Sequence, residues 1–141
     1  MKLVVNKAAV LGAGVMGAQI AAHLANANVP VVLFDLPAKE GDKNGIVKKA
    51  LDGLKRLQPS PLVARDKLQY IDAANYEEHL ELLSGCDLII EAIAERMDWK
   101  YDLYSKIAPF FLSFFFISSN TSFLSINALA EGLPEALRPN F

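Results

Sequence analysis

Short runs of apolar residues alternate along the chain with longer segments in which apolar residues recur every three or four positions. Continuous apolar runs are typical of parallel strands buried on both faces, and the longer spacing is typical of helices. We expect strands at residues 7–11, 31–34, 68–71, 87–93 and 114–118, and helices at residues 15 to about 28, 46–57, 76–83, 98–108 and 125–131. This alternation predicts an α/β fold, a Rossmann-type doubly wound parallel sheet with a helical insert after the second strand.

The two long helices of the first half show different patterns. In the first, Met16, Ile20 and Leu24 recur at intervals of four residues, which predicts a helix with one apolar stripe. The second is amphipathic, and its polar face carries Lys48, Lys49, Lys55 and Arg56.

The composition of the chain mainly excludes certain classes of protein, partner and site. The chain has 141 residues, of which 52% are hydrophobic and 21% charged, which fits one domain with a substantial core. A net charge of −2 predicts no nucleic-acid partner. The longest apolar run, residues 110–117, is far shorter than the ~20 residues that a membrane helix needs, so no membrane partner is expected. With one cysteine, Cys86, and two isolated histidines, we expect neither a disulfide nor a metal site. The N-terminus lacks the apolar core of a signal peptide, which predicts a cytoplasmic protein.

The strongest local signal is Gly-Ala-Gly-Val-Met-Gly at residues 12–17, between the first strand and the first helix. Gly12 permits a tight turn, Gly14 lets a pyrophosphate approach the backbone, and Gly17 lets the helix pack closely. Free N–H groups at the start of the helix would then face the phosphates. The alternative is a glycine turn in a sheet protein that binds no nucleotide.

An acidic residue closes the second strand. Asp35 lies 18 residues after Gly17, near the spacing expected for the carboxylate that holds the adenosine ribose of a dinucleotide. A carboxylate there accepts from both ribose hydroxyls and repels a 2′-phosphate, so NAD is favoured over NADP. Lys39 is the only nearby cation that argues for NADP.

A polar segment, Ser-Ser-Asn-Thr-Ser at residues 118–122, follows the last strand. Ligands of doubly wound sheets lie at the carboxyl ends of the strands, so these side chains are expected at the nicotinamide end of a dinucleotide. Two other interpretations are a glycosylation sequon at Asn120 and a cap, from Thr121 or Ser122, on the following helix.

Three segments together, residues 9–17, 87–95 and 119–122, resemble the N-terminal, NAD-binding domain of L-3-hydroxyacyl-CoA dehydrogenases. The resemblance covers essentially the whole chain and is closest to the form in the multifunctional fatty-acid oxidation proteins. It implies oxidation of a (3S)-3-hydroxyacyl-CoA to a 3-ketoacyl-CoA, with NAD as cofactor, an acyl-CoA substrate and a homo-oligomeric full-length enzyme. Residues 1–141 are then one Rossmann domain, incomplete at its C-terminus.

The resemblance also implies roles for matching positions. Ser122 would orient the substrate hydroxyl, and Glu95 would also take part in catalysis. Lys100 would approach the cofactor or substrate as a cation. The predicted cofactor-binding residues are Gly12, Gly14, Val15, Met16, Gly17, Asp35, Ile93, Ala94, Glu95, Lys100, Asn120 and Ser122.

Three departures from the family pattern matter. The family's catalytic histidine is absent, and we expect His23 and His79 on helices where neither replaces it. The phenylalanine-rich residues 110–116 would be an aggregation hazard if exposed. Phe123 stands where a small residue is usual and could crowd the nicotinamide pocket. The chain alone is therefore expected to be inactive.

Two further hypotheses stay open at this point. One is an NAD(P)-dependent dehydrogenase of the 3-hydroxyacid or 6-phosphogluconate type, against which Asp35 and residues 118–122 argue. The other is a non-catalytic nucleotide-binding module. The basic face of the second helix could also contact the phosphates of CoA, although a charged helix face is more often only solvated.

Overall fold

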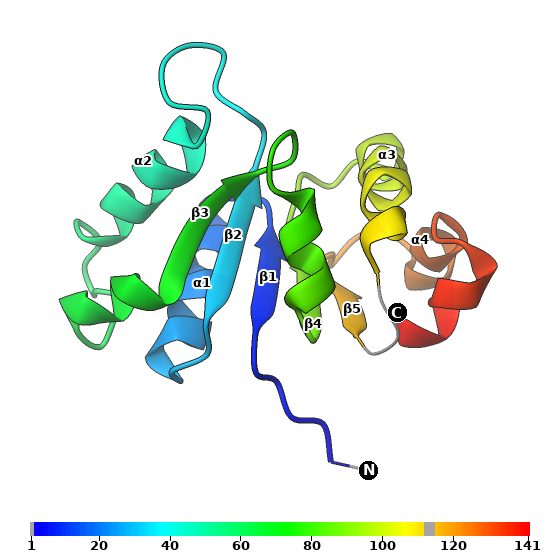
Figure 1. The fold of residues 1–141 in the computed structure, drawn as a ribbon, viewed down its shortest axis with the longest axis horizontal. Coiled ribbons are helices and arrows are strands. Elements are labelled where there is room, and N and C mark those ends of the chain that lie inside the picture. Colours follow the sequence, from blue (N-terminus) through cyan, green and yellow to red (C-terminus); the bar gives the residue numbers. More distant parts are fainter. Residues whose placement is uncertain (1, 112–114) are drawn as a thin grey trace.

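A computed structural model describes residues 2–111 and 115–141. Five parallel strands form one sheet in the order β3-β2-β1-β4-β5 (Figure 1). The strands are β1 (Ala8–Leu11), β2 (Val31–Asp35), β3 (Ile71–Asn75), β4 (Leu88–Glu91) and β5 (Phe116–Ser119). The strand β1 is apolar and wholly buried, and β2 is apolar and buried as far as Phe34, as expected for strands covered on both faces.

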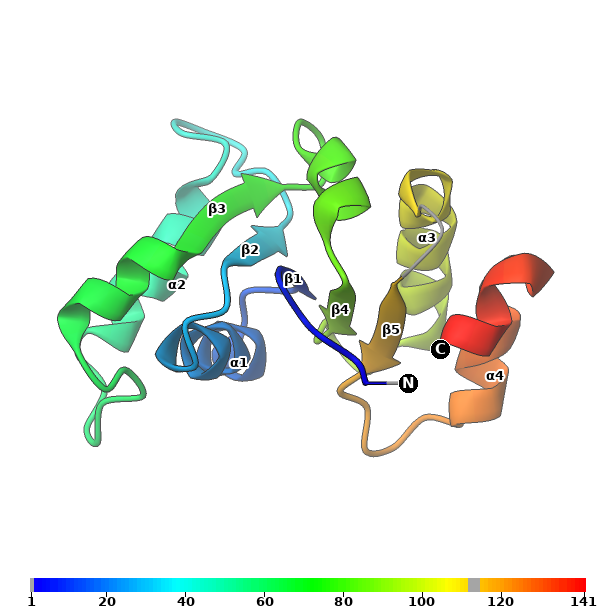
Figure 2. The ribbon, with the colours of Figure 1, turned by 60° about the horizontal axis from the view of Figure 1, so that its bottom comes forward.

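Helices cover both faces of the sheet (Figure 2). The helices α1 (Val15–Asn26) and α2 (Gly45–Leu54) lie on one face, where alanines of α1 pack on Val10, Val31 and Leu33. The helices α3 (Met97–Ile107) and α4 (Ile126–Glu131) lie on the other, around Leu11, Phe34 and Ile89. This is the doubly wound Rossmann-type fold predicted from the sequence.

The chain order creates a crevice at the carboxyl ends of the strands. From β1 the chain winds outward to β2 and β3, and it then returns to place β4 and β5 on the other side of β1. Loops that leave β1 and β4 therefore diverge to opposite faces, and such a switch point is where ligands bind in open α/β sheets.

The buried face of α1 differs from the expected stripe. The buried residues are Gly17, Ala18, Ala21, Ala22 and Ala25, whereas Met16 is 55% exposed. Small side chains let the helix backbone approach the sheet closely, so the larger residues are displaced to the edge of the contact. Ile20 and Leu24 of the expected stripe are partly buried and pack at this edge, whereas alanines form the centre of the contact.

The third strand lies later than predicted. Residues 65–70 form a short 3-10 helix, and β3 begins only at Ile71. Because β3 is an edge strand that mixes buried Ile71 and Ala74 with exposed Asp72, it lacks the apolar run that marks the central strands. The predicted helix at 76–83 is instead a 3-10 helix, η2 (Leu80–Gly85). The other elements lie within a few residues of their predicted positions.

The phenylalanine-rich segment is only partly sheltered. Phe115 is buried, and its ring stacks on Phe111 with 4.2 Å between centroids. Phe116, in contrast, is 43% exposed. Residues 112–114 of this run lie outside the described residues. Among the described residues, none of the helices has the length and apolar character of a membrane span, and no three His, Cys, Asp or Glu side chains there are grouped so that they could hold a metal ion.

Candidate cofactor-binding site

The three glycines of the β1–α1 turn have separate structural roles. Gly12 has φ +107°, and a Cβ there would lie 2.7 Å from the carbonyl oxygen of Ala92. A Cβ on Gly17 would overlap the carbonyl oxygen of Gly12. The turn therefore requires glycine at both positions. Gly14 is different, because no atom lies within 4 Å of a Cβ placed there.

The open space over Gly14 lies at the start of α1. Gly14 is the N-cap residue, and its carbonyl oxygen accepts from Ala18 N at 3.0 Å. Val15 and Met16 follow in the first turn, where backbone N–H groups lack intrahelical partners, and both residues are exposed. Free N–H groups beside open space suit an anionic pyrophosphate, so this part of the structure fits a dinucleotide.

Asp35 is held against the glycine turn. Its Oδ2 accepts from Ala13 N at 2.7 Å, and its Oδ1 accepts from Leu36 N at 2.7 Å. Both bonds come from backbone and orient the carboxylate at the end of β2. Since each carboxylate oxygen can accept more than one bond, the group keeps acceptor capacity for the two hydroxyls of a ribose.

A cleft of about 540 Å³ opens beside these groups. Gly12, Gly14 and Asp35 line it together with Ile93 and Ala94 from the loop after β4, so it collects five of the predicted residues. Leu36, which follows β2, and Tyr76, which follows β3, also line the cleft. The helix α3 contributes Trp99, Asp102, Leu103 and Lys106. The Arg96 guanidinium lies 4.3 Å from the centroid of the Trp99 ring.

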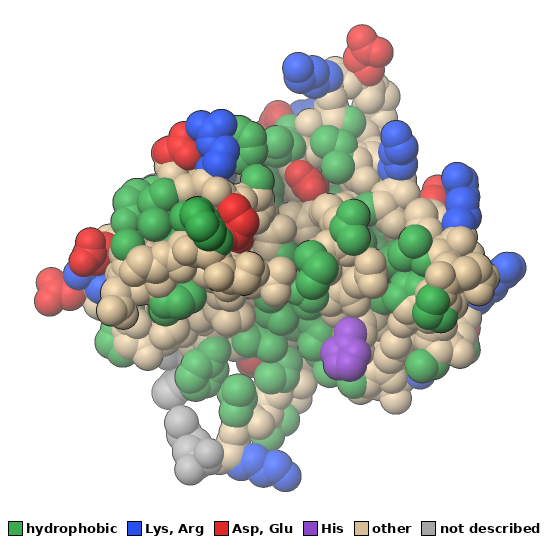
Figure 3. All heavy atoms as spheres, turned by 180° about the vertical axis from the view of Figure 1, so that it is seen from behind, with side chains coloured by type: hydrophobic (Ala, Val, Ile, Leu, Met, Phe, Trp, Pro, Cys, Tyr) green, Lys and Arg blue, Asp and Glu red, His purple; other side chains and the backbone are tan. Residues whose placement is uncertain are grey.

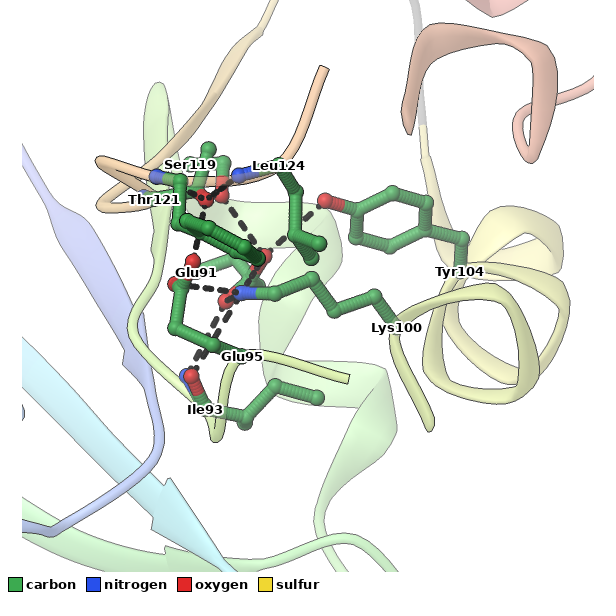
Figure 4. A network of polar contacts seen from close by, with 9 residues as sticks. Glu91, Ile93, Glu95, Lys100, Tyr104, Ser119, Thr121 and Leu124 are labelled. Atoms are coloured by element: carbon green, nitrogen blue, oxygen red, sulfur yellow. Dashed lines mark hydrogen bonds and ion pairs between the residues drawn. The ribbon is translucent and has the colours of Figure 1, made fainter. Parts of the chain in front are cut away.

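The loop after β4 is fixed by a buried carboxylate that the sequence analysis did not single out. Glu91 is 0% exposed and ends β4. Its Oε1 accepts from Tyr104 Oη at 3.0 Å and from Ser119 Oγ at 2.8 Å, and its Oε2 accepts from Ile93 N at 3.0 Å (Figure 4). One side chain thereby joins β4, β5, α3 and the loop that lines the cleft.

Lys100 lies elsewhere than the sequence predicted. Its side chain is 0% exposed, and Nζ donates to Oε1 and Oε2 of Glu91 at 2.8 and 2.6 Å. A buried carboxylate is stable only with a partner of opposite charge, and Lys100 supplies that charge from α3. Its Nζ also lies 3.4 Å from the Ile93 carbonyl oxygen and 3.7 Å from Glu95 Oε1. Lys100 therefore stabilises the loop after β4 through Glu91 and Ile93, and it is not a free cation that faces the cleft.

The turn after β5 carries the remaining predicted residues. Asn120 and Ser122 are exposed, and the Asn120 backbone N–H donates to the Glu91 carbonyl oxygen at 2.7 Å. Thr121 Oγ1 donates to Glu95 Oε2 at 2.5 Å, which ties this turn to the loop after β4. Phe123 is 84% exposed and does not line the cleft.

Two smaller expectations need correction. The cap of α4 is Ser125, whose Oγ accepts from Ala128 N at 3.3 Å, whereas Thr121 Oγ1 accepts from Leu124 N within its own turn. His79 follows the carboxyl end of β3 instead of lying on a helix. Its Nδ1 accepts from Asn75 N at 3.1 Å, and it does not line the cleft.

The sequence analysis missed Tyr76, Glu91 and Tyr104, and the two tyrosines look like ordinary core residues in the sequence. A signal for Glu91 did exist, since it is a charged residue at the end of the apolar run Leu-Ile-Ile. A charge in a strand buried on both faces needs a partner, so Lys100 could have been sought as that partner.

A glycine turn that opens a helix, with an acidic residue at the end of the next strand of a doubly wound sheet, defines a dinucleotide-binding domain. The comparison with protein families is specific. Residues 7–139 match the family described as 3-hydroxyacyl-CoA dehydrogenase, NAD binding domain, and the chain belongs to this family.

Individual relatives agree with that assignment. The chain is 44% identical over 138 residues to a Rickettsia felis protein named as a fatty acid oxidation complex trifunctional enzyme, covering 97% of this chain and 19% of the relative. It is 39% identical to a Deinococcus radiodurans protein named as a 3-hydroxyacyl-CoA dehydrogenase, covering 97% and 40%. The crystal structure of 3-hydroxybutyryl-CoA dehydrogenase from Escherichia coli matches with a TM-score of 0.76 at 29% identity, covering 96% and 29%. The chain thus spans less than half the length of each of these relatives.

Proposed function

We propose that this chain is the cofactor-binding part of an enzyme that oxidises (3S)-3-hydroxyacyl-CoA to 3-ketoacyl-CoA in fatty-acid β-oxidation. The observation that carries the proposal is the open space over Gly14, beside the oriented carboxylate of Asp35, in a chain of this dehydrogenase family. Bound NAD supplies the hydride acceptor. The first turn of α1 holds its pyrophosphate, and Asp35 holds its adenosine ribose.

Ser122 orients the substrate hydroxyl from the turn after β5, which also carries Asn120 and is bonded to Glu95 through Thr121. An alcohol with an ordinary pKa does not accept the proton that leaves the substrate, whereas histidine is suited to that task near neutral pH. Neither histidine lines the cleft, since His23 is exposed on α1 and His79 is bonded to the backbone after β3. We therefore assign the base to residues outside residues 1–141.

A second cleft supports an acyl-CoA as the substrate. It has a volume of about 450 Å³, lies between α1 and α2, and shares Gly14 with the cofactor cleft. Lys49 lines it, whereas Lys48 forms an ion pair with Asp42 and Lys55 with Asp52. Figure 3 shows the Lys and Arg side chains of this side of the molecule scattered, mostly near its outline, and not gathered in one patch. Lys49 is therefore the cation we assign to the CoA phosphates, and Lys49→Gln should weaken CoA binding more than Lys55→Gln does.

The proposal has three broader parts, of which the resemblance to the family supports the first two. Residues 1–141 form an NAD-binding domain that is completed by residues beyond it. The complete enzyme is a homo-oligomer that assembles through a domain outside this chain. The reaction takes place in the cytoplasm.

A titration with NADH tests the proposed function. The only tryptophan, Trp99, lines the cofactor cleft, so bound NADH should quench its fluorescence by energy transfer. We expect saturable binding of NADH, weaker binding of NADPH, and negligible turnover of 3-hydroxybutyryl-CoA by residues 1–141 alone. Absence of NADH binding would refute the cofactor role, and robust turnover would show that the chain contains a base that we have not identified.

A further inference from the structure

Tyr76 has a polar atom that the described residues leave unpaired. The residue is only 6% exposed, and in residues 2–111 and 115–141 no hydrogen-bond partner exists for its hydroxyl. Its ring stacks on Phe34, with 5.8 Å between centroids and 9° between planes. Tyr76 also lines the cofactor cleft.

An unpaired buried donor destabilises a folded protein, so such groups call for an explanation. Burial, with the nearby carboxylates of Asp35 and Glu91, raises the pKa of Tyr76 well above its usual value. The phenol therefore keeps its proton at neutral pH and remains a donor. Phenylalanine would fill the same space and stack on Phe34 without this cost, which indicates that the hydroxyl has a use.

We propose that the Tyr76 hydroxyl donates a hydrogen bond to the adenosine half of the bound dinucleotide. This proposal rests on the cofactor binding described under the proposed function. Tyr76 directly follows β3, and its backbone N–H donates to the Asp35 carbonyl oxygen at 3.2 Å, so it lies at the ribose-binding end of the cleft.

The nicotinamide end lies on the other side of the sheet. In the order β3-β2-β1-β4-β5, four strand spacings separate the strand before Tyr76 from the strand before Ser122. At ~4.8 Å per spacing this is a separation of roughly 19 Å, far beyond a direct hydrogen bond. The strand that leads to Tyr76 is thus next to the strand of Asp35 and farthest from that of Ser122, which favours the adenosine half.

Tyr76→Phe tests the proposal, because it removes the hydroxyl and keeps the ring. We expect NADH and ADP-ribose to bind about tenfold more weakly, which corresponds to about 1.4 kcal/mol. Binding of reduced nicotinamide mononucleotide should not change, and the Tm without ligand should stay the same or rise. Tyr101→Phe is the matched control, since the Tyr101 hydroxyl donates to the Ala128 carbonyl oxygen at 2.5 Å and does not line the cleft. This control should lower the Tm and leave the affinity for NADH unchanged.

Each other outcome has a definite meaning. If Tyr76→Phe binds NADH as tightly as the wild type, the proposal is wrong, and a lower Tm in addition would mean that the hydroxyl binds only water. Equal weakening of the mononucleotide and of ADP-ribose would overturn the assignment to the adenosine half. Failure of the wild type to bind NADH would overturn the proposed function itself, and this proposal with it.

Discussion

At the β4–β5 end of the cofactor cleft, both carboxylate oxygens of Glu91 accept hydrogen bonds from the protein. At the β2–β3 end, the hydroxyl of Tyr76 finds no partner within the described residues. Both groups are buried, so the difference does not come from solvent. The first end is built to be rigid before any ligand arrives, because a fully satisfied network has one favoured arrangement. The second end keeps a donor that no described residue satisfies, and we propose that a ligand does so.

The two ends also differ in how charge is handled. Asp35 is partly exposed and is oriented by backbone N–H groups, so its negative charge remains available to a ligand. Glu91 and Lys100 are both 0% exposed and neutralise each other. Burial thus turns one carboxylate into a structural element, while the other remains a recognition group. Four predictions test this contrast.

The largest effect is expected at the buried ion pair. Lys100→Met leaves the Glu91 carboxylate buried without its counter-charge, which should lower the free energy of unfolding by about 3–5 kcal/mol. Urea denaturation followed by circular dichroism measures this loss. Combining Lys100→Met with Glu91→Gln removes both charges and should recover part of the stability. An unchanged midpoint in Lys100→Met would show that the pair contributes no stability.

The glycine turn separates ligand binding from folding. Gly14→Val places a side chain in the open space over the turn, so the affinity for NADH should fall at least ~100-fold, about 2.8 kcal/mol. The Tm should change little, because no atom lies within 4 Å of a Cβ at this position. Gly17→Ala is the contrasting variant, since its Cβ would overlap the Gly12 carbonyl oxygen and should destabilise the fold. Equal NADH affinity in a folded Gly14→Val variant would refute the pyrophosphate site.

Tyr104 and Tyr76 allow a direct comparison of the two ends of the cleft. Tyr104→Phe removes a donor to the charged Glu91, and loss of such a bond should lower the free energy of unfolding by about 1.5–3 kcal/mol. Tyr76→Phe removes a hydroxyl that has no partner among the described residues. Without ligand, the free energy of unfolding should therefore stay the same or rise. Chemical denaturation of both variants shows whether each substitution lowers or raises the free energy of unfolding. An equal loss of stability in both variants would contradict the proposed difference between the two ends of the cleft.

The smallest effect is expected at Asp35. Asp35→Asn retains an oxygen that can accept from Ala13 N and removes the charge that repels a 2′-phosphate. The preference for NADH over NADPH should therefore fall by about tenfold, or about 1.4 kcal/mol. Parallel titrations with the two nucleotides measure it. A wild-type protein that binds both equally would show that Asp35 does not select the cofactor.

Much of this architecture was predictable because its causes are local. The glycine spacing at residues 12–17 reflects the geometry of one turn, and the structure confirms that Gly12 and Gly17 leave no room for a side chain. The apolar runs of β1, β2 and β4 reflect burial on both faces, so these strands were found within a few residues. The edge strand β3 was misplaced, because its composition is mixed and its position depends on pairing with β2.

The sequence by itself determined the α/β class, the glycine turn, the acidic end of β2 and the resemblance to the family to which the chain belongs. These features depend on residues close together in the chain. Only the tertiary structure decided that Lys100 meets Glu91 and that the Tyr76 hydroxyl lies unpaired among the described residues at the cleft. Both depend on how α3 and the end of β3 pack against β4 and β2. A side chain's partner, and therefore its role, follows from that packing, because burial removes the water that would otherwise satisfy any polar group.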